Sequence, residues 1–190
     1  MNWYIFYTPR GWAAIRSEKR TLFATVLPTP SPLNTFHHRI KQTGYDTRFV
    51  AWDDFSIPIV NKFRDYFNGK MIEHWDVELD LSQYSAFTRD VLLLVHSIPY
   101  GEIMTYGQVA RQLGKPGAAR AVGQVMRKNP MALVVPCHRV VSSNGWGGFS
   151  AAGGLDLKAA MLHMEWQQTG RIPPLAQRLS LNQTPLSTNI

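Results

Sequence analysis

The sequence is poor in cysteine, in acidic residues and in long apolar runs, and two of these shortages exclude classes of protein. A single cysteine, Cys137, cannot form an internal disulfide, so a disulfide-stabilised secreted domain is excluded and a cytoplasmic location is expected. No segment approaches the roughly 18 uninterrupted apolar residues of a membrane-spanning helix. The first residues lack a basic segment followed by an apolar one, so we expect no secretory signal.

The shortage of acidic residues is confined to one half of the chain. The net charge is +7, from 20 Lys+Arg and 13 Asp+Glu. Residues 1–81 carry ten basic and nine acidic residues, whereas residues 82–190 carry ten and four. A basic field of this kind is typical of proteins that bind nucleic acids, although many basic proteins bind none specifically.

The length of 190 residues allows one domain or two small ones, with a substantial core. In the first part, three apolar segments separated by turn residues predict an antiparallel meander, with strands at residues 3–7, 12–15 and 21–26. We then predict a helix at 32–42, a strand at 48–52, a helix capped by Asp53 or Asp54 and ended by Asn68-Gly69, and a strand at 75–79.

The second part is predicted to be mainly helical. A helix with Phe87 and Val91 on its apolar face ends before Pro99, and Thr105 caps a second helix over 106–113. A turn at 114–117 leads to a third helix over 118–127, which is the outline of a helix-turn-helix, although such pairs are also common in proteins that never meet DNA. A last helix is predicted at 158–166, followed by a mostly unstructured tail at 171–190.

Cys137 lies in an apolar run that is interrupted by a Pro-Cys-His-Arg sequence. Pro136 restricts the backbone before it, and His138 and Arg139 are groups that can favour a thiolate over a thiol. A reactive thiol is one interpretation, and a buried structural cysteine is the other, because cysteine is among the residues most often buried.

Several segments around this cysteine resemble the O6-alkylguanine-DNA alkyltransferases, also called methylated-DNA-protein-cysteine methyltransferases. Pro136-Cys137-His138-Arg139-Val140 matches the active-site signature of that family. Other family segments follow in the same order over roughly residues 82–168, namely Tyr100-Gly101-Glu102, Thr105-Tyr106, residues 118–123, Asn129-Pro130, Gly153-Gly154-Leu155, Lys158 and Glu165. Residues 1–81 match only loosely.

The resemblance implies an α+β fold with two domains and a tail. Residues 1–81 would form a small α/β, ribonuclease H-like domain with an antiparallel sheet. Residues 82–170 would form a mainly helical, winged helix-turn-helix-like domain for DNA binding and alkyl transfer, followed by the tail 171–190.

The resemblance also implies direct-reversal DNA repair, in which the alkyl group of O6-alkylguanine moves irreversibly to Cys137; activity on O4-alkylthymine stays open. His138 would take the thiol proton through a water, and Glu165 would accept a hydrogen bond from His138. Tyr106 would donate a proton or hydrogen bond to the guanine ring, and Asn129 would tie the turn that leads to the active-site strand.

For DNA, the resemblance implies a helix in the minor groove and a nucleotide turned out of the duplex. Arg120 would fill the gap left by that nucleotide. Its neighbours Ala118, Ala119, Ala121 and Gly123 have little bulk and would let the backbone approach DNA, although small residues also serve tight helix packing. Lys115 and Ser143 complete the expected DNA contacts.

The pocket for the base is expected to involve the Cys137 and Val140 carbonyls, a backbone amide near Ser150, and residues Trp146, Phe149 and Lys158; Met104 is a further candidate. The glycine-rich segment 142–154 could approach a ligand through its backbone or be a flexible loop. Where well-known relatives have Tyr-Ser before Gly-Gly, this chain has Phe149-Ser150-Ala151-Ala152, so which of residues 149–151 meets the O6 oxygen is open.

We expect no cofactor and no metal. Some relatives hold zinc in the first domain partly through cysteines, but this chain has none there, and His37, His38 and His74 lack a carboxylate grouping. The expected partner is double-stranded DNA containing alkylated guanine, bound by a monomer away from membranes. Two alternatives are a lesion sensor without activity, in which relatives replace the cysteine, and a cysteine hydrolase that uses Cys137, His138 and Glu165.

Overall fold

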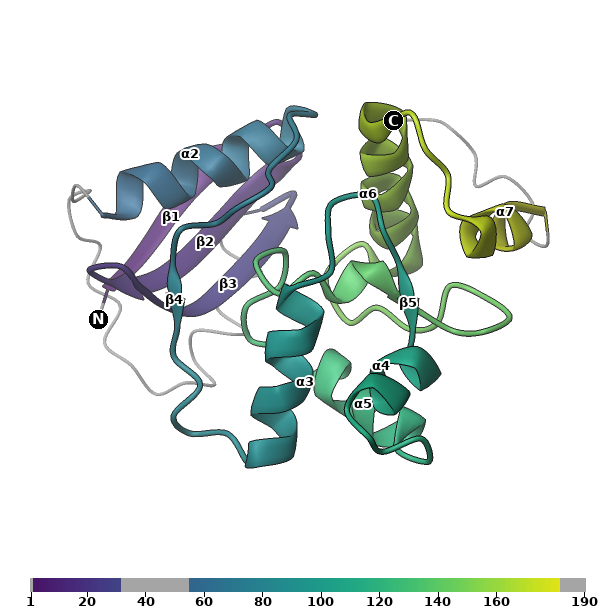
Figure 1. The fold of residues 1–190 in the computed structure, drawn as a ribbon. Coiled ribbons are helices and arrows are strands. Elements are labelled where there is room, and N and C mark those ends of the chain that lie inside the picture. Colours follow the sequence, from purple (N-terminus) through teal and green to yellow (C-terminus); the bar gives the residue numbers. More distant parts are fainter. Residues whose placement is uncertain (1, 32–54, 182–190) are drawn as a thin grey trace. The chain divides into compact units, whose positions relative to one another are not determined.

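The computed structural model describes residues 2–31 and 55–181 (Figure 1). The chain divides into two compact units, Met1–Gln83 with Pro130–Val134, and Tyr84–Asn129 with Val135–Ile190. Strands dominate the first unit and helices the second, so the predicted α+β class is confirmed. The predicted helix at 32–42 and strand at 48–52 lie outside the described residues.

The first unit contains a sheet with the order β1-β2-β3-β4. Strands β1 (Asn2–Thr8), β2 (Gly11–Glu18) and β3 (Thr21–Thr29) form the predicted antiparallel meander, and each runs further than expected. The predicted strand at 75–79 shrinks to β4 (Glu78–Leu79), which pairs with β3 in parallel.

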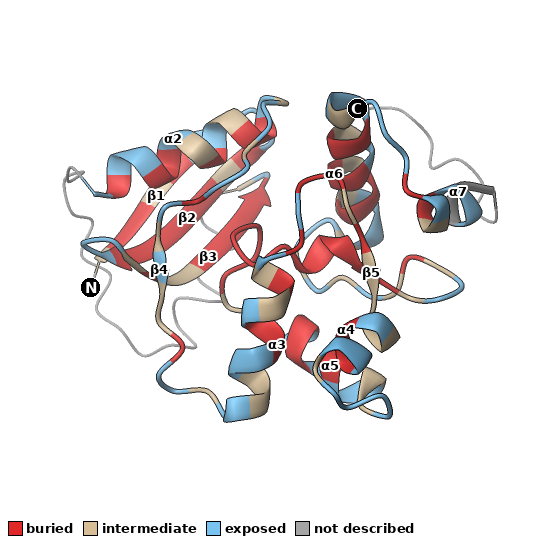
Figure 2. Cartoon of the chain, viewed as in Figure 1, coloured by how far each residue is buried: buried red, intermediate tan, exposed pale blue. Residues whose placement is uncertain are grey.

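Helix α2 (Ser56–Phe67) packs on this sheet through its apolar face (Figures 1 and 2). The Phe63 ring meets the Phe6 ring edge-on at 5.7 Å between centroids, which buries both side chains. Phe55 occupies the N-cap position without a side-chain hydrogen bond, and the predicted caps Asp53 and Asp54 lie outside the described residues.

The segment Pro130–Val134, which the sequence analysis placed with the second half, belongs to the first unit. Thr25 holds it at two points: its N–H donates to the Pro130 carbonyl (2.8 Å) and its hydroxyl donates to the Ala132 carbonyl (2.7 Å). The chain therefore passes through the first unit immediately before Cys137.

The second unit is built from helices α3 (Ala86–His96), α4 (Tyr106–Gln112), α5 (Ala119–Arg127), α6 (Gly154–Thr169) and α7 (Pro174–Leu181), with a short parallel pair of β5 (Met104–Thr105) and β6 (Val140–Val141). The predicted cap at Thr105 is confirmed: its hydroxyl accepts the Gln108 N–H (3.0 Å), and the Gln108 side chain accepts the Thr105 N–H (2.6 Å), a capping box.

The prediction of an unstructured segment from residue 171 is wrong for α7. Ala176 is fully buried and joins an apolar cluster with Ile103, Val141, Trp146, Ala159, Leu162 and Trp166, against which Leu175 also packs. Two apolar contacts on a short helix were too weak a signal in the sequence. Helix α6 likewise extends beyond the predicted 158–166 at both ends. In the described parts of the chain, no helix is long and apolar enough to cross a membrane.

Candidate active site

Cys137 begins a 3₁₀ turn, Cys137–Arg139, rather than lying in the expected strand. Pro136 has φ −78° and ψ 67°, and the Cys137 N–H donates to the Val135 carbonyl at 2.8 Å, which is an inverse γ-turn. The Arg139 N–H then donates to the Pro136 carbonyl at 2.8 Å. Two tight turns in succession thus set the direction of the Cys137 side chain, and the residue is 8% exposed.

Asn129 fixes the first of these turns. Its side-chain amide donates to the Val135 carbonyl at 2.8 Å, the same oxygen that accepts the Cys137 N–H. Asn129 is itself buried, so this bond is shielded from water. Asn129, two residues beyond the end of α5, is thereby tied to the backbone two residues before the cysteine.

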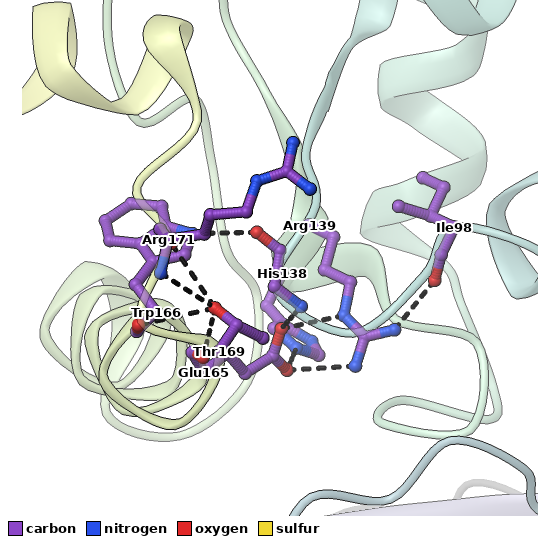
Figure 3. A network of polar contacts seen from close by, with 8 residues as sticks. Ile98, His138, Arg139, Glu165, Trp166, Thr169 and Arg171 are labelled. Carbon is purple, nitrogen blue, oxygen red and sulfur yellow. Dashed lines mark hydrogen bonds and ion pairs between the residues drawn. The ribbon is translucent and has the colours of Figure 1, made fainter.

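His138 and Glu165 form a fully buried pair, with 2.8 Å between His138 Nε2 and Glu165 Oε1 (Figure 3). Glu165 accepts three further hydrogen bonds: from Arg139 Nε to Oε2 (2.9 Å), from Arg139 Nη2 to Oε1 (3.0 Å), and from the Gly101 N–H to Oε2 (2.9 Å). The carboxylate is therefore held on both oxygens by groups from two parts of the chain, the turn at His138-Arg139 and the backbone at Gly101.

The charge states of this pair follow from its surroundings. Burial lowers the pKa of His138, although Glu165 opposes the shift, so the imidazole is neutral at neutral pH. Burial alone would raise the pKa of Glu165, but His138 and Arg139 reverse this and hold it below its ordinary value. With the carboxylate ionised, Nε2 of His138 carries the proton donated to Glu165, and Nδ1 has the lone pair that can accept a proton.

Arg139 contacts different groups from those that its position beside Cys137 suggested. Its guanidinium bonds to Glu165, donates to the Ile98 carbonyl (2.8 Å) and lies 5.3 Å from the centre of the Tyr100 ring. These hydrogen bonds go to the carboxylate and to a backbone carbonyl rather than to the thiol. Arg139 therefore stabilises ionised Glu165, a role that its sequence position did not indicate.

Lys158 supplies a buried cation beside Cys137. Its ammonium donates to the Val140 carbonyl at 2.7 Å and to the Gly148 carbonyl at 3.4 Å. Burial lowers the pKa of Lys158 to about 8, and negative charge on Cys137 opposes that shift. The attraction is mutual, so an ammonium at this position favours a thiolate at Cys137.

Tyr106 is the first residue of α4 and packs against the loop that follows β6. A Cβ at Gly147, where φ is +71°, would lie 2.8 Å from the Tyr106 hydroxyl oxygen, so the ring rests directly on that backbone. Burial raises the pKa of Tyr106; a hydrogen bond with the Gly148 backbone opposes this and the charge of Cys137 adds to it. The phenol therefore keeps its proton and can donate it.

A cleft of about 890 Å³ opens onto Cys137. Eight of the predicted site residues line it: Tyr106, Ala119, Arg120, Gly123, Cys137, Ser143, Phe149 and Ser150. The Ser150 hydroxyl donates to the Arg127 carbonyl (2.9 Å) and ties the loop to the end of α5.

The sequence analysis missed several lining residues, Arg111, Gln124 and Arg127 among them. Only the excess of basic residues pointed to these two arginines. None of the described residues that line the cleft is acidic.

Other predicted residues lie away from the cleft lining. Five of them are buried around Cys137: His138, Glu165, Asn129, Lys158 and Val140. Three others belong to α5 or to the turn before it: Lys115, Ala118 and Ala121. The Lys115 ammonium lies 5.1 Å from the centre of the Phe87 ring.

The placement of Trp146 in the base pocket is wrong. Its ring is buried in the apolar cluster and stacks on Trp166 with 6.1 Å between centroids, because an indole gains more by burial than by exposure in an open cleft.

No group of three or more potential metal ligands occurs within residues 2–31 and 55–181. His74 is among these residues, whereas His37 and His38 lie outside them.

Known proteins share both the sequence and the fold of this chain. The family model for the 6-O-methylguanine DNA methyltransferase DNA-binding domain matches residues 86–167. The structure is similar to the crystal structure of Mycobacterium tuberculosis O6-methylguanine methyltransferase, with a TM-score of 0.68 and 31% identity over 91% of this chain and 95% of that one. The chain belongs to the methylated-DNA-protein-cysteine methyltransferase family.

Two further comparisons bear on this family. A methylated-DNA-protein-cysteine methyltransferase of Mycolicibacterium paratuberculosis is 48% identical over 107 residues, which are 56% of this chain and 62% of the relative. The match thus spans less than two thirds of that methyltransferase. The structure of Mycobacterium tuberculosis OGT in complex with DNA has a TM-score of 0.69 and 32% identity, covering 92% of this chain and 97% of that one.

Proposed function

We propose that this protein repairs alkylated DNA by transferring the alkyl group from the O6 oxygen of guanine to Cys137. The observation that carries the proposal is the position of Cys137 in a basic cleft, directly followed in the chain by a histidine that is hydrogen-bonded to a buried carboxylate. The names of the relatives and the structure of Mycobacterium tuberculosis OGT with DNA support the same activity.

The first step is removal of the thiol proton. Neutral His138 accepts it on Nδ1 through a water, and the resulting imidazolium is stabilised by Glu165, which stays ionised through Arg139 and Gly101. The Lys158 ammonium adds a second positive charge near the sulfur. Asn129 acts as a positioning residue by holding the turn before Cys137.

In the transfer itself, the sulfur forms a bond to the alkyl carbon while the bond from that carbon to O6 breaks. The electron pair of the broken bond stays on the guanine, and Tyr106 donates a proton or hydrogen bond to the ring as the charge develops. The carbonyls of Cys137 and Val140 accept the guanine amine; each accepts one internal hydrogen bond already and has a second lone pair.

The product is a thioether on Cys137. A thioether has no carbonyl that water could attack, so no hydrolytic step restores the thiol, and each molecule acts once. This outcome distinguishes the protein from a cysteine hydrolase, in which an acyl intermediate is released. The backbone near Phe149 and Ser150, which line the cleft, would meet the O6 oxygen.

DNA would reach the cleft by its minor groove, with the damaged nucleotide turned out of the duplex. Helix α5 presents Ala119 and Gly123 to the cleft, so a nucleic-acid backbone can approach closely, and Arg120 would fill the space that the nucleotide leaves. In this proposal α4 and α5 act as a helix-turn-helix, Lys115 and Ser143 contact phosphates, and the protein works as a monomer in the cytoplasm.

The finer description of the two units belongs to the same proposal. The first unit would be ribonuclease H-like, and the second would be a winged helix-turn-helix that carries both DNA binding and chemistry. Two features support this division: the first unit has a meander covered by α2, and the second has the α4–α5 pair.

The decisive experiment is incubation of the protein with O6-benzylguanine followed by intact mass measurement. We expect a gain of one benzyl group per molecule and no further turnover, with no gain for Cys137→Ser, which should still bind duplex DNA. An adduct on Cys137→Ser would show that a residue other than Cys137 is the nucleophile. Absence of any wild-type adduct would indicate a lesion sensor, and repeated release of an acyl product would indicate a hydrolase.

A further inference from the structure

Trp146 lies in the middle of the loop that lines the cleft beside Cys137, but its own side chain is not part of the lining and is buried in the apolar cluster of the second unit. It is 5% exposed and stacks on Trp166 of α6, with His163 at 6.0 Å between centroids. Among residues 142–152, all of which are described, Trp146 is the one buried residue. The loop is therefore attached to α6 mainly at this point.

The two residues that follow Trp146 contact the reacting groups. Gly147 lies against the Tyr106 ring so closely that a Cβ would meet the hydroxyl oxygen at 2.8 Å. The Gly148 backbone lies close enough to the Tyr106 hydroxyl to oppose the rise of its pKa, and the Gly148 carbonyl accepts from the Lys158 ammonium at 3.4 Å. The indole, the phenol and the ammonium are thus connected through three consecutive residues.

Two glycines in a row cannot hold such a geometry by themselves, because glycine populates many backbone conformations. The other contacts of the loop lie on either side of this segment: the Ser142 N–H donates to the Gly145 carbonyl (3.1 Å), and Ser150 bonds to Arg127. A buried indole between these contacts restricts the backbone of Gly147 and Gly148 directly.

We propose that Trp146 is a positioning residue for alkyl transfer. By anchoring the loop in the apolar cluster, it holds Gly147 and Gly148 against Tyr106 and Lys158, and so sets the position from which Tyr106 donates to the leaving guanine. The inference rests on the proposed transfer to Cys137. It assigns a role in the reaction to a residue that does not touch the substrate.

The test compares the rate of benzyl transfer from free O6-benzylguanine in four proteins: wild type, Trp146→Ala, Tyr106→Phe and the double variant. We expect Trp146→Ala to slow transfer by roughly tenfold or more, since small displacements of reacting groups have effects of this size. In the Tyr106→Phe background the same substitution should slow transfer much less, because two residues that act through one contact are not additive.

Two further variants separate positioning from general loss of stability. Trp146→Phe keeps a buried ring and should recover most of the rate. Leu92→Ala removes a fully buried side chain from α3, outside the cluster that holds Trp146, and should lower the Tm while the rate at temperatures below unfolding stays near that of wild type.

Three outcomes would overturn the inference: wild-type rates in folded Trp146→Ala, an equal slowing in both Tyr106 backgrounds, or the same slowing in Leu92→Ala. If wild-type protein forms no adduct at all, the proposed function fails instead, so the two failures are distinguishable.

Discussion

Glu165 accepts four hydrogen bonds in a site without exposure to water, and this concentration of donors decides which charges the site can hold. A buried carboxylate is costly unless it is fully paired. Arg139 supplies the charge and Gly101 supplies a neutral donor, which leaves His138 free to change its protonation state while Glu165 stays ionised.

Replacing Glu165 by Gln should reduce the free energy of unfolding by about 3–5 kcal/mol, because Arg139 would then be a buried charge without a counter-ion. Urea unfolding measures this effect. Glu102→Gln is the matched control: Glu102 pairs with Arg171 at 3.5 Å on the surface, where such pairs contribute about 0–1 kcal/mol. Equal losses in both variants would contradict the assignment.

The stabilising effect of Glu165 should depend on pH. Its pKa is lower in the folded protein than its ordinary value of 4.5, so the contribution is present above that value and is lost as the pH falls below it. The difference in stability between wild type and Glu165→Gln should therefore narrow on acidification.

For Lys158 we predict that the free energy of unfolding changes at alkaline pH. The unfolded chain keeps the lysine proton up to the ordinary pKa of 10.5, whereas the folded protein releases it near 8. Between these values the unfolded state binds more protons, so the free energy of unfolding should rise with pH, by on the order of 3 kcal/mol.

Urea unfolding from pH 7 to 10.5 tests this prediction through the difference between wild type and Lys158→Met. The variant should lack the rise. Lys128→Met, which removes an exposed lysine, should keep it. Parallel curves for wild type and Lys158→Met would show that Lys158 stays protonated in the folded state.

At the scale of elements, α6 organises the site because its buried face carries two charged side chains. Lys158 and Glu165 are seven residues apart, two turns of helix, and therefore lie on the same side as Leu162. The side chains reach the Val140 carbonyl and His138 respectively, so one rigid helix sets both charges. Helix α7 packs on the apolar cluster that holds this face in place.

Helix α7 should therefore contribute to stability. Ala176→Asp would place a carboxylate without a partner in the apolar cluster, and we expect a loss of several kcal/mol and a clear drop in Tm by calorimetry. Gln177→Asp introduces the same charge at the next position, which is exposed, and should change the Tm little. A similar Tm for both variants would mean that α7 is not packed there in solution.

At the scale of the whole molecule, basic side chains gather at the cleft that opens onto Cys137. The net charge of +7 comes largely from residues 82–190, and Arg111, Arg120 and Arg127 line the cleft. None of the three forms an ion pair within the described parts of the chain. The Arg111 guanidinium lies against Gly107, with 3.6 Å between its Nη1 and a Cβ added there.

We expect Arg111→Gln to weaken binding to duplex DNA and to reduce the slope of log K against log salt by about 0.9, the effect of losing one phosphate contact. Fluorescence anisotropy at several salt concentrations measures it. Arg178→Gln on α7 removes the same charge from an exposed position outside the cleft lining and should leave the slope unchanged. Equal slopes for the two variants would exclude a phosphate contact at Arg111.

Much of this arrangement could be predicted from local sequence. The meander, the Thr105 cap and the helices at 106–113 and 118–127 follow from patterns within a few residues, and the structure has them at nearly the predicted places. The signature around Cys137 similarly indicated which residues would gather at the site. Trp146 and α7 were predicted wrongly because both join an apolar cluster with Ile103, Val141 and α6, and local sequence patterns do not show which side chains meet in such a cluster.

The sequence by itself determined the family, the one cysteine that can act as a nucleophile, and the basic character of the second half, since these depend on residue identity and order. Only the tertiary structure decided that Arg139 forms an ion pair with Glu165, that Lys158 is a buried cation, and that Trp146 anchors the loop. The physical reason is that burial and pairing set the charge of a group, and both arise from residues that folding brings together across long stretches of chain.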